Sequence, residues 1–428
     1  MLRPILCLLV LLSLPAAAQI LDDSTRQVYG PSTTGYRLER DLFNGIDTVY
    51  TLDTSYFGGH NYEFAWQPPY YHHLGELGTA AQPLFYPLPE VGHRLGVNVY
   101  DLYAYDNDDV RYFDTRSPFT SLYYVQGTRG QQWLTVDFSR NVTPRWNVGL
   151  RWRRLSSDRQ IAPSTNRRVN TRADHHAVII ETSYASEDGR YRLVGNYRHL
   201  NHFVFESGGL LLRPGDDQED LLRSVQAQTE LERLSSSAIT RDRRNNFHVY
   251  HQYDLTPTNP DRRRSALRPA QLFHVLDRHW QRFSYNDDEL GFAQSSVGYT
   301  AGTDFYPNRY FDSTLTSHPL YYSDWENTLG IKGRLTGLQY SLFFFRRDLR
   351  LDRPRLDPAY TRAENYGGAT LKYFINDTNY VETEARYELG GSYRFTGRFV
   401  TNWFNVEWIR QRTPATFVQQ FYLGNHFA

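Results

Sequence analysis

The sequence predicts an all-β protein, an antiparallel transmembrane β-barrel with about 12–14 strands. Segments of about ten residues, the length of a tilted strand across a bilayer, alternate strictly between apolar and polar side chains. The connections between these segments alternate between short and long. Aromatic residues make up 15% of the 428 residues, and Tyr alone occurs 33 times. Aromatic girdles at the two membrane interfaces explain such a composition.

The first 18 residues have the pattern of a signal peptide. Arg3 provides the charged start, residues 5–14 the apolar core, and Ala16 to Ala18 the small-residue cleavage site. The apolar run is too short to span a membrane as a helix. Because Cys7 is the only cysteine, the exported chain is expected to have no disulfide, iron–sulfur cluster or thiol chemistry. The 47 basic and 47 acidic residues balance, so no nucleic-acid partner is indicated.

Residues 19–92 lack sustained alternation and contain Pro-rich breaks at residues 68–69 and 87–89. We interpret them as an N-terminal extension that either lies at the periplasmic mouth of the barrel or folds into its lumen as a plug. The barrel is then expected to occupy residues 93–428, in the outer membrane.

The clearest hairpin covers residues 131–155. In its second strand Arg145, Asn147, Gly149, Arg151 and Arg153 share one face, and the opposite face carries Trp146, Val148, Leu150 and Trp152. Membrane barrels turn their apolar residues outward and their polar residues toward a wet lumen. We therefore expect the lipid-facing residues to be Trp146, Val148, Leu150 and Trp152.

The remaining strands are expected over residues 94–105, 119–126, 131–139, 176–184, 190–200, 247–255, 271–283, 325–333, 338–346, 369–375 and 381–389, with about two more in 393–421. Short turns are expected at residues 141–144, 186–189, 334–336 and 376–379. Long polar connections are expected at residues 156–173, 201–246, 284–324 and 347–366. A soluble sandwich has no reason to keep its long connections at one end, so the pattern favours a barrel with short periplasmic turns and long external loops.

Charged residues on the polar face of the predicted strands form the candidate site. Rings of charge in a wet pore set its ion preference. Alternatively, such residues pair across neighbouring strands, at ~0.2–1 kcal/mol per pair, and simply fill the lumen; both can hold together. The candidates are Arg145, Arg151, Arg153, Asp137, Glu181, Arg192, Arg198, Glu382 and Glu384.

The other polar groups do not predict a metal site or a catalytic site. His175, His176, His199 and His202 lack zinc-like spacing and are interpreted as interfacial polar residues. Residues 106–109 lack the Gly and the distal Glu of a calcium loop. Residues 216–231, inside the longest connection, have the acidic start and apolar spacing of a helix. No catalytic residue, cofactor or metal site is predicted.

Several motifs resemble a known family. Residues 112–120 read Tyr-Phe-Asp-Thr-Arg-Ser-Pro-Phe-Thr, and the pattern continues through Gln131-Gln132, Asn141 and Trp146-Asn147. Residues 74–78 (Leu-Gly-Glu-Leu-Gly) and 206–209 (Glu-Ser-Gly-Gly) belong to the same resemblance, which extends over the chain from about Thr48 onward. The chain resembles the putative porins of Bacteroidetes outer membranes, and the resemblance implies an outer-membrane β-barrel. Relatives usually continue beyond the Asn-His-Phe element found at residues 425–427. The chain is therefore either a truncated product or a smaller barrel.

The function predicted from these observations is passive diffusion of small hydrophilic solutes through a charged lumen, without covalent chemistry or cofactor. The expected partners are outer-membrane lipid and the solutes, and the oligomeric state stays open. One alternative is a plugged structural or partner-binding barrel of an outer-membrane complex. A less favoured one is a lipid-modifying enzyme, which would need a Ser/His/acid set at the rim; the sequence shows no such set.

Overall fold

The computed structural model describes residues 33–46, 48–52, 71–160, 171–206, 217, 238–256, 268–288, 310, 312, 315–352, 359–376, 378–389 and 391–421. The predicted signal peptide lies outside the described residues. So does the helix expected at residues 216–231, apart from Asp217. Among the residues that are described, no helix has the length and apolarity needed to cross a bilayer.

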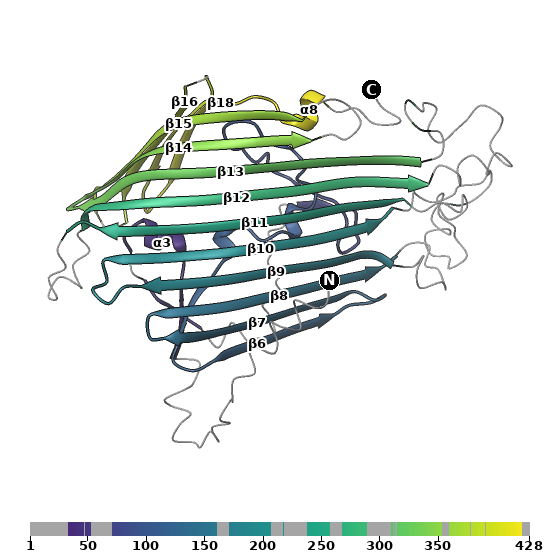
Figure 1. Ribbon diagram of the computed structural model, residues 1–428, viewed down its shortest axis with the longest axis horizontal. Coiled ribbons are helices and arrows are strands. Elements are labelled where there is room, and N and C mark those ends of the chain that lie inside the picture. The colour runs from purple at the N-terminus through teal and green to yellow at the C-terminus, as the bar shows by residue number, and fades with distance from the viewer. Residues whose placement is uncertain are drawn as a thin grey trace, which may run out of the picture.

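Thirteen strands form one curved antiparallel sheet in which each strand pairs with its neighbours in the sequence (Figure 1). The predicted antiparallel all-β fold is thus confirmed. In the described residues β6 and β18 each pair on one side only, so the sheet has two edges. The strands are β6 (Phe119–Gln126), β7 (Gln132–Thr143), β8 (Trp146–Asp158), β9 (Thr171–Ala185), β10 (Tyr191–Phe205), β11 (Ile239–Asp254), β12 (Arg268–Asp288), β13 (Leu315–Leu335), β14 (Leu338–Asp352), β15 (Tyr360–Phe374), β16 (Tyr380–Glu388), β17 (Tyr393–Val400) and β18 (Asn405–Arg412).

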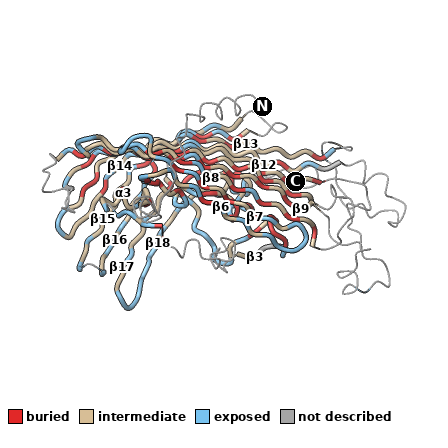
Figure 2. The backbone as a smooth tube through the Cα atoms, turned by 90° about the horizontal axis from the view of Figure 1, so that it is seen from below, coloured by how far each residue is buried: buried red, intermediate tan, exposed pale blue. Residues whose placement is uncertain are grey.

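The concave side of the sheet holds the described residues that lie between positions 33 and 115 (Figure 2). We call residues 33–46, 48–52 and 71–115 the inner segment. A short helix, α8 (Phe417–Phe421), contacts it through Phe417, whose amide donates to the carbonyl of Arg94 at 2.9 Å. The elements of the inner segment are β1 (Thr34–Arg37), α3 (Glu39–Phe43), β2 (Tyr50–Thr51), β3 (Tyr71–His73), β4 (Ala81–Pro83), η3 (Asp101–Tyr103), η4 (Asn107–Asp109) and β5 (Tyr112–Thr115).

The strand predicted at residues 94–105 is wrong. This stretch is irregular apart from the 3-10 helix η3, and it belongs to the inner segment. Leu95, Tyr100 and Tyr103 are all buried. Their apolar side chains pack within the concave interior, so the apolar pattern in the sequence reflects packing rather than a place in the sheet.

The two faces of the sheet have inverted polarity compared with a soluble protein. On β8, Trp146 and Leu150 are each 42% exposed, whereas Arg151 and Arg153 are only 7% and 3% exposed. Soluble sheets bury the apolar face and hydrate the polar one. Here the convex face carries a band of exposed apolar residues that extends from β6 to β18, as at Leu122, Ile180, Phe247, Leu329, Leu342, Phe344, Leu371 and Trp408.

The apolar band of the convex face runs obliquely to the strands. On β8 it ends at Trp152, before Arg154, and on β14 it ends at Phe344, before Arg346. When the directly paired residues are followed from strand to strand, Phe344 of β14 is level with Trp146 of β8 and not with Trp152. The limit therefore shifts by six residues (146 to 152) across six strand steps (β8 to β14). A shift of one residue (about 3.3 Å) per strand, with neighbouring strands ~4.8 Å apart, corresponds to a strand tilt of about 35°. This tilt is at the lower end of the range for membrane barrels.

Several strands are longer than a bilayer requires. β12 and β13 have 21 residues each, whereas a tilted strand crosses a bilayer with about 9–11. Parts of the predicted connections 201–246, 284–324 and 347–366 are therefore strand. Beyond the apolar band the convex face carries charged residues such as Arg154 and Arg346, and these strand ends depart from the apolar alternation by which the strands were predicted. We call the end of the sheet where β8–β9, β10–β11, β12–β13 and β14–β15 connect the long-connection end, and the opposite end the short-turn end.

Leu150 tests the membrane placement of the convex face. The variant Leu150→Arg puts a charge on the apolar band and is expected to lower folding stability by about 2–4 kcal/mol if the residue lies near the bilayer midplane. Ser156→Arg, on the same face of β8 but beyond the band, is the control. Both variants are refolded into lipid vesicles, and their denaturant midpoints are compared. Equal midpoints for the two variants would mean that the convex face of β8 is not in lipid.

Candidate functional site

The candidate site is the concave face of the sheet together with the inner segment. Five of the charges predicted to face the lumen lie on this face and are buried: Asp137, Arg151, Arg153, Glu181 and Arg198. Arg151 and Asp137 form an ion pair across β7 and β8, with Nε and Oδ1 2.5 Å apart. Arg153 donates to the carbonyl oxygen of Tyr103, and Arg198 to that of Tyr105 at 3.3 Å. These groups therefore bind one another and the backbone of the inner segment.

Two other candidates lie at the short-turn end. Arg145 belongs to the turn between β7 and β8 rather than to the strand, and it is paired with Glu187 of the next turn at 3.4 Å. Arg192 is half-buried near the start of β10. Both residues line a cavity of about 220 Å³ between the strand ends and the inner segment.

Glu382 and Glu384 lie on a part of the concave face that stays accessible to solvent. Glu382 is 3.6 Å from Lys372, and Glu384 is 2.6 Å from Arg386. Their side chains are 31% and 30% exposed. A third pair joins Arg398 and Glu407 of β17 and β18 at 2.9 Å. We call the following residues the accessible charged surface: Lys372, Glu382, Glu384, Arg386, Arg398 and Glu407.

A chain of hydrogen bonds connects the inner segment to β8, β9 and β10. His202 Nε2 is 2.8 Å from the carbonyl oxygen of Gly78, and its Nδ1 is 3.1 Å from Nδ1 of His175. Arg153 Nε donates to His175 Nε2 at 3.3 Å. Because the carbonyl oxygen can only accept, His202 Nε2 carries the proton and donates to it. His202 Nδ1 is then unprotonated and accepts a hydrogen bond from the Nδ1–H group of His175. Both rings are then neutral and fully hydrogen-bonded.

This connection requires a glycine. Gly78 has a φ of +87°, and a Cβ there would lie 2.5 Å from the Cβ of Ala173. Tyr103 stacks on His202 with ring centroids 5.1 Å apart, accepts from the amide of Gly78 at 3.1 Å and donates to the carbonyl of Thr79 at 3.0 Å. Burial raises the pKa of the Tyr103 hydroxyl, which therefore stays a donor at neutral pH.

The interpretation of the four histidines as interfacial residues is wrong for two of them. His175 and His202 are completely buried on the concave side. His176 and His199 have the opposite parity and lie on the convex face, where His176 stacks on Trp152 with ring centroids 6.4 Å apart. The doublet His175-His176 thus places one ring on each face of the sheet.

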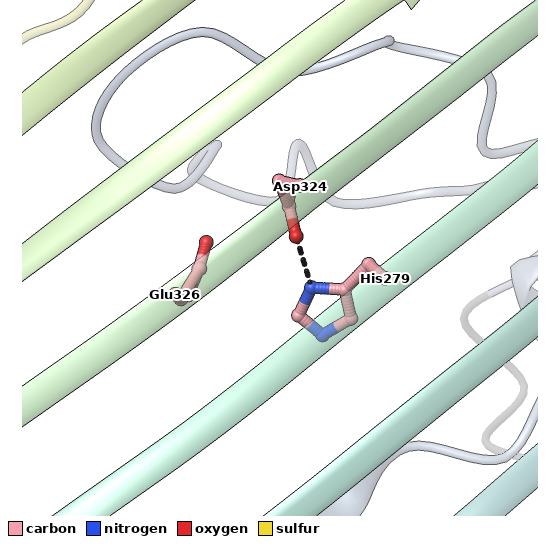
Figure 3. A group of neighbouring side chains, drawn as sticks. All are labelled: His279, Asp324 and Glu326. Carbon is pink, nitrogen blue, oxygen red and sulfur yellow. Dashed lines mark hydrogen bonds and ion pairs between the residues drawn. The ribbon is translucent and has the colours of Figure 1, made fainter.

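A second contact region clamps residues 90–95 of the inner segment to β12 and β13. His279 Nδ1 is 2.8 Å from Asp324 Oδ1, and Glu326 lies next to this pair (Figure 3). These three side chains converge closely enough to hold a metal ion. The positive charge at this place is Arg94, whose Nη1 is 3.1 Å from both carboxylates. The cluster is therefore occupied by a guanidinium of the inner segment, and the geometry fits an ion-pair clamp.

The clamp extends to β14 and β15. His93 Nδ1 is 2.6 Å from Glu364 Oε1, and Arg347 donates to Glu364 Oε2 and to the carbonyl of Val91, both at 3.0 Å. Gly92 has a φ of +96°, and a Cβ there would lie 2.3 Å from the Tyr366 hydroxyl. Sequence reasoning missed these residues because the partners are 230 and more positions apart. The only feature of the local sequence that could have pointed to the clamp is the run of Gly92, His93 and Arg94.

The third region holds α3 against β11–β13. Lys332 Nζ donates to the carbonyl oxygens of Leu42 and Phe43 at 3.1 and 2.5 Å, which satisfies groups at the C-terminal end of the helix. His248 lies between Glu39 and Asp277, with contacts of 2.7 and 2.6 Å. Each of the three regions thus pairs charged side chains of the sheet with backbone or charge of the inner segment.

The fold and the filled concave face define a β-barrel type of membrane protein with a polypeptide inside it. Residues 34–428 match the family model described as "Putative porin", and the chain belongs to this family. No curated protein matches the sequence.

Two solved structures show a partial similarity to this chain. One is the siderophore receptor PiuA from Acinetobacter baumannii, with a TM-score of 0.41 and 9% identity, covering 70% of this chain and 46% of the receptor. The other is FpvAI in complex with pyocin S2, with a TM-score of 0.38 and 11% identity, covering 68% of this chain and 41% of that chain. The protein thus spans less than half the length of either one.

Arg94 tests whether the clamp holds the inner segment. Arg94→Gln removes the guanidinium from the buried carboxylate of Asp324, which keeps its contacts with His279 and Tyr322, and breaking a buried pair costs up to about 3–5 kcal/mol. We expect faster amide hydrogen exchange over residues 90–105, measured by mass spectrometry. Arg37→Gln, which removes an exposed ion pair with Asp114, should have an effect of about 0–1 kcal/mol. Unchanged exchange in Arg94→Gln would contradict the clamp.

Proposed function

We propose that this protein is an outer-membrane channel through which small hydrophilic solutes diffuse, and that the inner segment narrows its lumen. The main support is the accessible charged surface on the concave face of β15–β18. It combines exposed carboxylates and cations on the side of the sheet opposite the apolar band. Charged groups that line a wet passage favour hydrated solutes and tune ion preference. The proposed mechanism needs no covalent step and no cofactor.

In this proposal residues 1–18 are the signal peptide that directs export. The long-connection end of the sheet faces the outside of the cell. A Bacteroidetes origin, implied by the resemblance of the motifs, belongs to the same proposal. The lipid-facing assignment of Trp146, Val148, Leu150 and Trp152 is supported by their place on the convex face, and it stays a prediction until lipid contact is measured.

A second candidate function is a plugged barrel that binds a partner. It is favoured by the burial of Asp137, Arg151 and Arg153 under the inner segment, because buried wall charges do not line a water path. The two functions differ in a single observable. The full chain, reconstituted in planar bilayers, conducts ions if it is a channel and is silent if the plug closes it.

Selectivity tests the proposed path. Replacing Glu382 and Glu384 by Gln removes two negative charges from the accessible charged surface. The reversal potential in a salt gradient should shift toward anion preference, and the shift should shrink at high salt as the Debye length falls from about 10 Å at 0.1 M to about 3 Å at 1 M. Asp348→Asn, which removes a carboxylate from the convex face, is the control. If the protein conducts but its reversal potential is unchanged by the Glu382 and Glu384 substitutions, the ion path does not pass the accessible charged surface.

A further inference from the structure

Three arginines on the convex face take no part in the contacts described above. Arg241 and Arg243 are two residues apart on β11 and share one face, and Arg282 on β12 is directly opposite Arg243. The residue between the first two, Asp242, is completely buried on the concave side. We call Arg241, Arg243 and Arg282 the arginine triad.

The arginine triad has no carboxylate partner among the described residues. Arg243 Nε donates to the neutral side chain of Asn201 at 3.1 Å. The buried Nε of Arg241 has no hydrogen-bond partner in this part of the chain. Like charges directly opposite each other on neighbouring strands are destabilising. Within the described residues the arrangement therefore leaves a positive charge on the outside of the sheet.

Aromatic rings hold two of these guanidiniums in place. Arg241 lies 5.4 Å from the ring centroid of Phe203, and Arg282 lies 4.9 Å from that of Tyr321. A guanidinium stacked on a ring keeps its N–H donors in its own plane, where they can bind two oxygens of one anionic group. The aromatic contacts thus orient the cations without neutralising them.

The arginine triad lies just beyond the apolar band, toward the long-connection end. On β11 the last large exposed apolar residue of the convex face is Phe247. Arg243 is four residues further (247 − 243), about 13 Å along the strand. Long arginine side chains reach back toward a membrane interface. This level corresponds to the head groups of the leaflet at the long-connection end.

We propose that the arginine triad binds the phosphate groups of an anionic lipid in the outer leaflet. Arginine forks match phosphate oxygens bidentately, and three positive charges at the edge of a lipid-facing band suit a head group anchored by acyl chains. The same face of β14 serves as a contrast. There Arg346 is paired with Asp348 at 2.8 Å and Arg350 with Asp352 at 3.2 Å, so no charge remains for a ligand. The inference rests on the proposed membrane placement and does not require solute passage.

The test uses the purified full chain in non-ionic detergent micelles, titrated with bis-phosphorylated lipid A and monitored by native mass spectrometry. Each basic residue at an anionic membrane surface contributes about 1 kcal/mol. The double variant Arg243→Ala/Arg282→Ala should therefore bind about 30-fold more weakly, which is about 2 kcal/mol at about 1.4 kcal/mol per factor of ten. Arg350→Ala, a paired arginine on the same face, should bind like the wild type.

Two comparisons keep the result unambiguous. Lipid A stripped of phosphate should bind the wild type no better than it binds the double variant, and inorganic phosphate alone should compete weakly. Equal affinity of wild type and double variant for the phosphorylated lipid would overturn the proposal. If the alanine variant does not fold, Arg243→Lys/Arg282→Lys keeps the charge and loses the fork, and should bind several-fold more weakly than the wild type; unchanged affinity would overturn the proposal equally. A protein that conducts but does not bind the lipid refutes only this inference, whereas one that binds but does not conduct refutes only the channel.

Discussion

Backbone hydrogen bonding without water is the constraint on which the rest of this structure depends. In a bilayer every N–H and C=O group must find its partner within the protein, and a continuous antiparallel ladder provides those partners for the strands between the edges β6 and β18. Once the backbone is satisfied within the sheet, side-chain polarity follows the surroundings of each face. Leu150 and Trp146 are exposed on the convex face, and the neighbouring Arg151 is buried on the concave face. The inverted polarity is thus a consequence of the ladder placed between lipid and a polar interior.

A polar concave face has to be either hydrated or matched by polypeptide, because an unpaired buried charge is costly. Both solutions occur in this molecule. Across β7–β15 the inner segment supplies carbonyl oxygens to Arg153, Arg198 and Arg347 and a guanidinium to Asp324. On β16–β18 the inner segment supplies a carbonyl to Gln411, which donates to Pro89 at 2.7 Å, while Glu384 and Arg386 pair with each other in solvent-accessible surroundings. The division of the concave face into a covered and an accessible part follows the path of the inner segment.

The sequence allowed prediction of what depends on neighbours along the strand. Period-two alternation is local, so the opposite faces of Leu150 and Arg151 could be predicted from the residues of β8 alone. The state of a residue on the concave face is not local. Whether Arg153 meets water or the carbonyl of Tyr103 depends on where a segment 50 residues away folds. The clamp of Arg94 on Asp324, 230 residues away, leaves no trace in the sequence around either residue. The expected strand at residues 94–105 failed for the same reason, because apolar residues that fill an interior look like half of an alternating strand.

The inner segment and the accessible charged surface are compatible with one function because Glu382 and Glu384 are exposed with the inner segment in place. Arg153 and Arg198 bind the inner segment through neutral backbone carbonyls, and water can replace a carbonyl as acceptor with little net change in hydrogen-bond energy. The Arg94 clamp differs, since it pairs charge with charge and buries Asp324 completely. The region around Gly78 is held by charge as well, because Glu76 pairs with Arg172 of β9 at 2.8 Å and Asp101 with Arg244 of β11 at 2.6 Å. The inner segment is thus anchored by ion pairs at both places, and the accessible charged surface is the part of the concave face where wall charges meet water without any displacement of the inner segment.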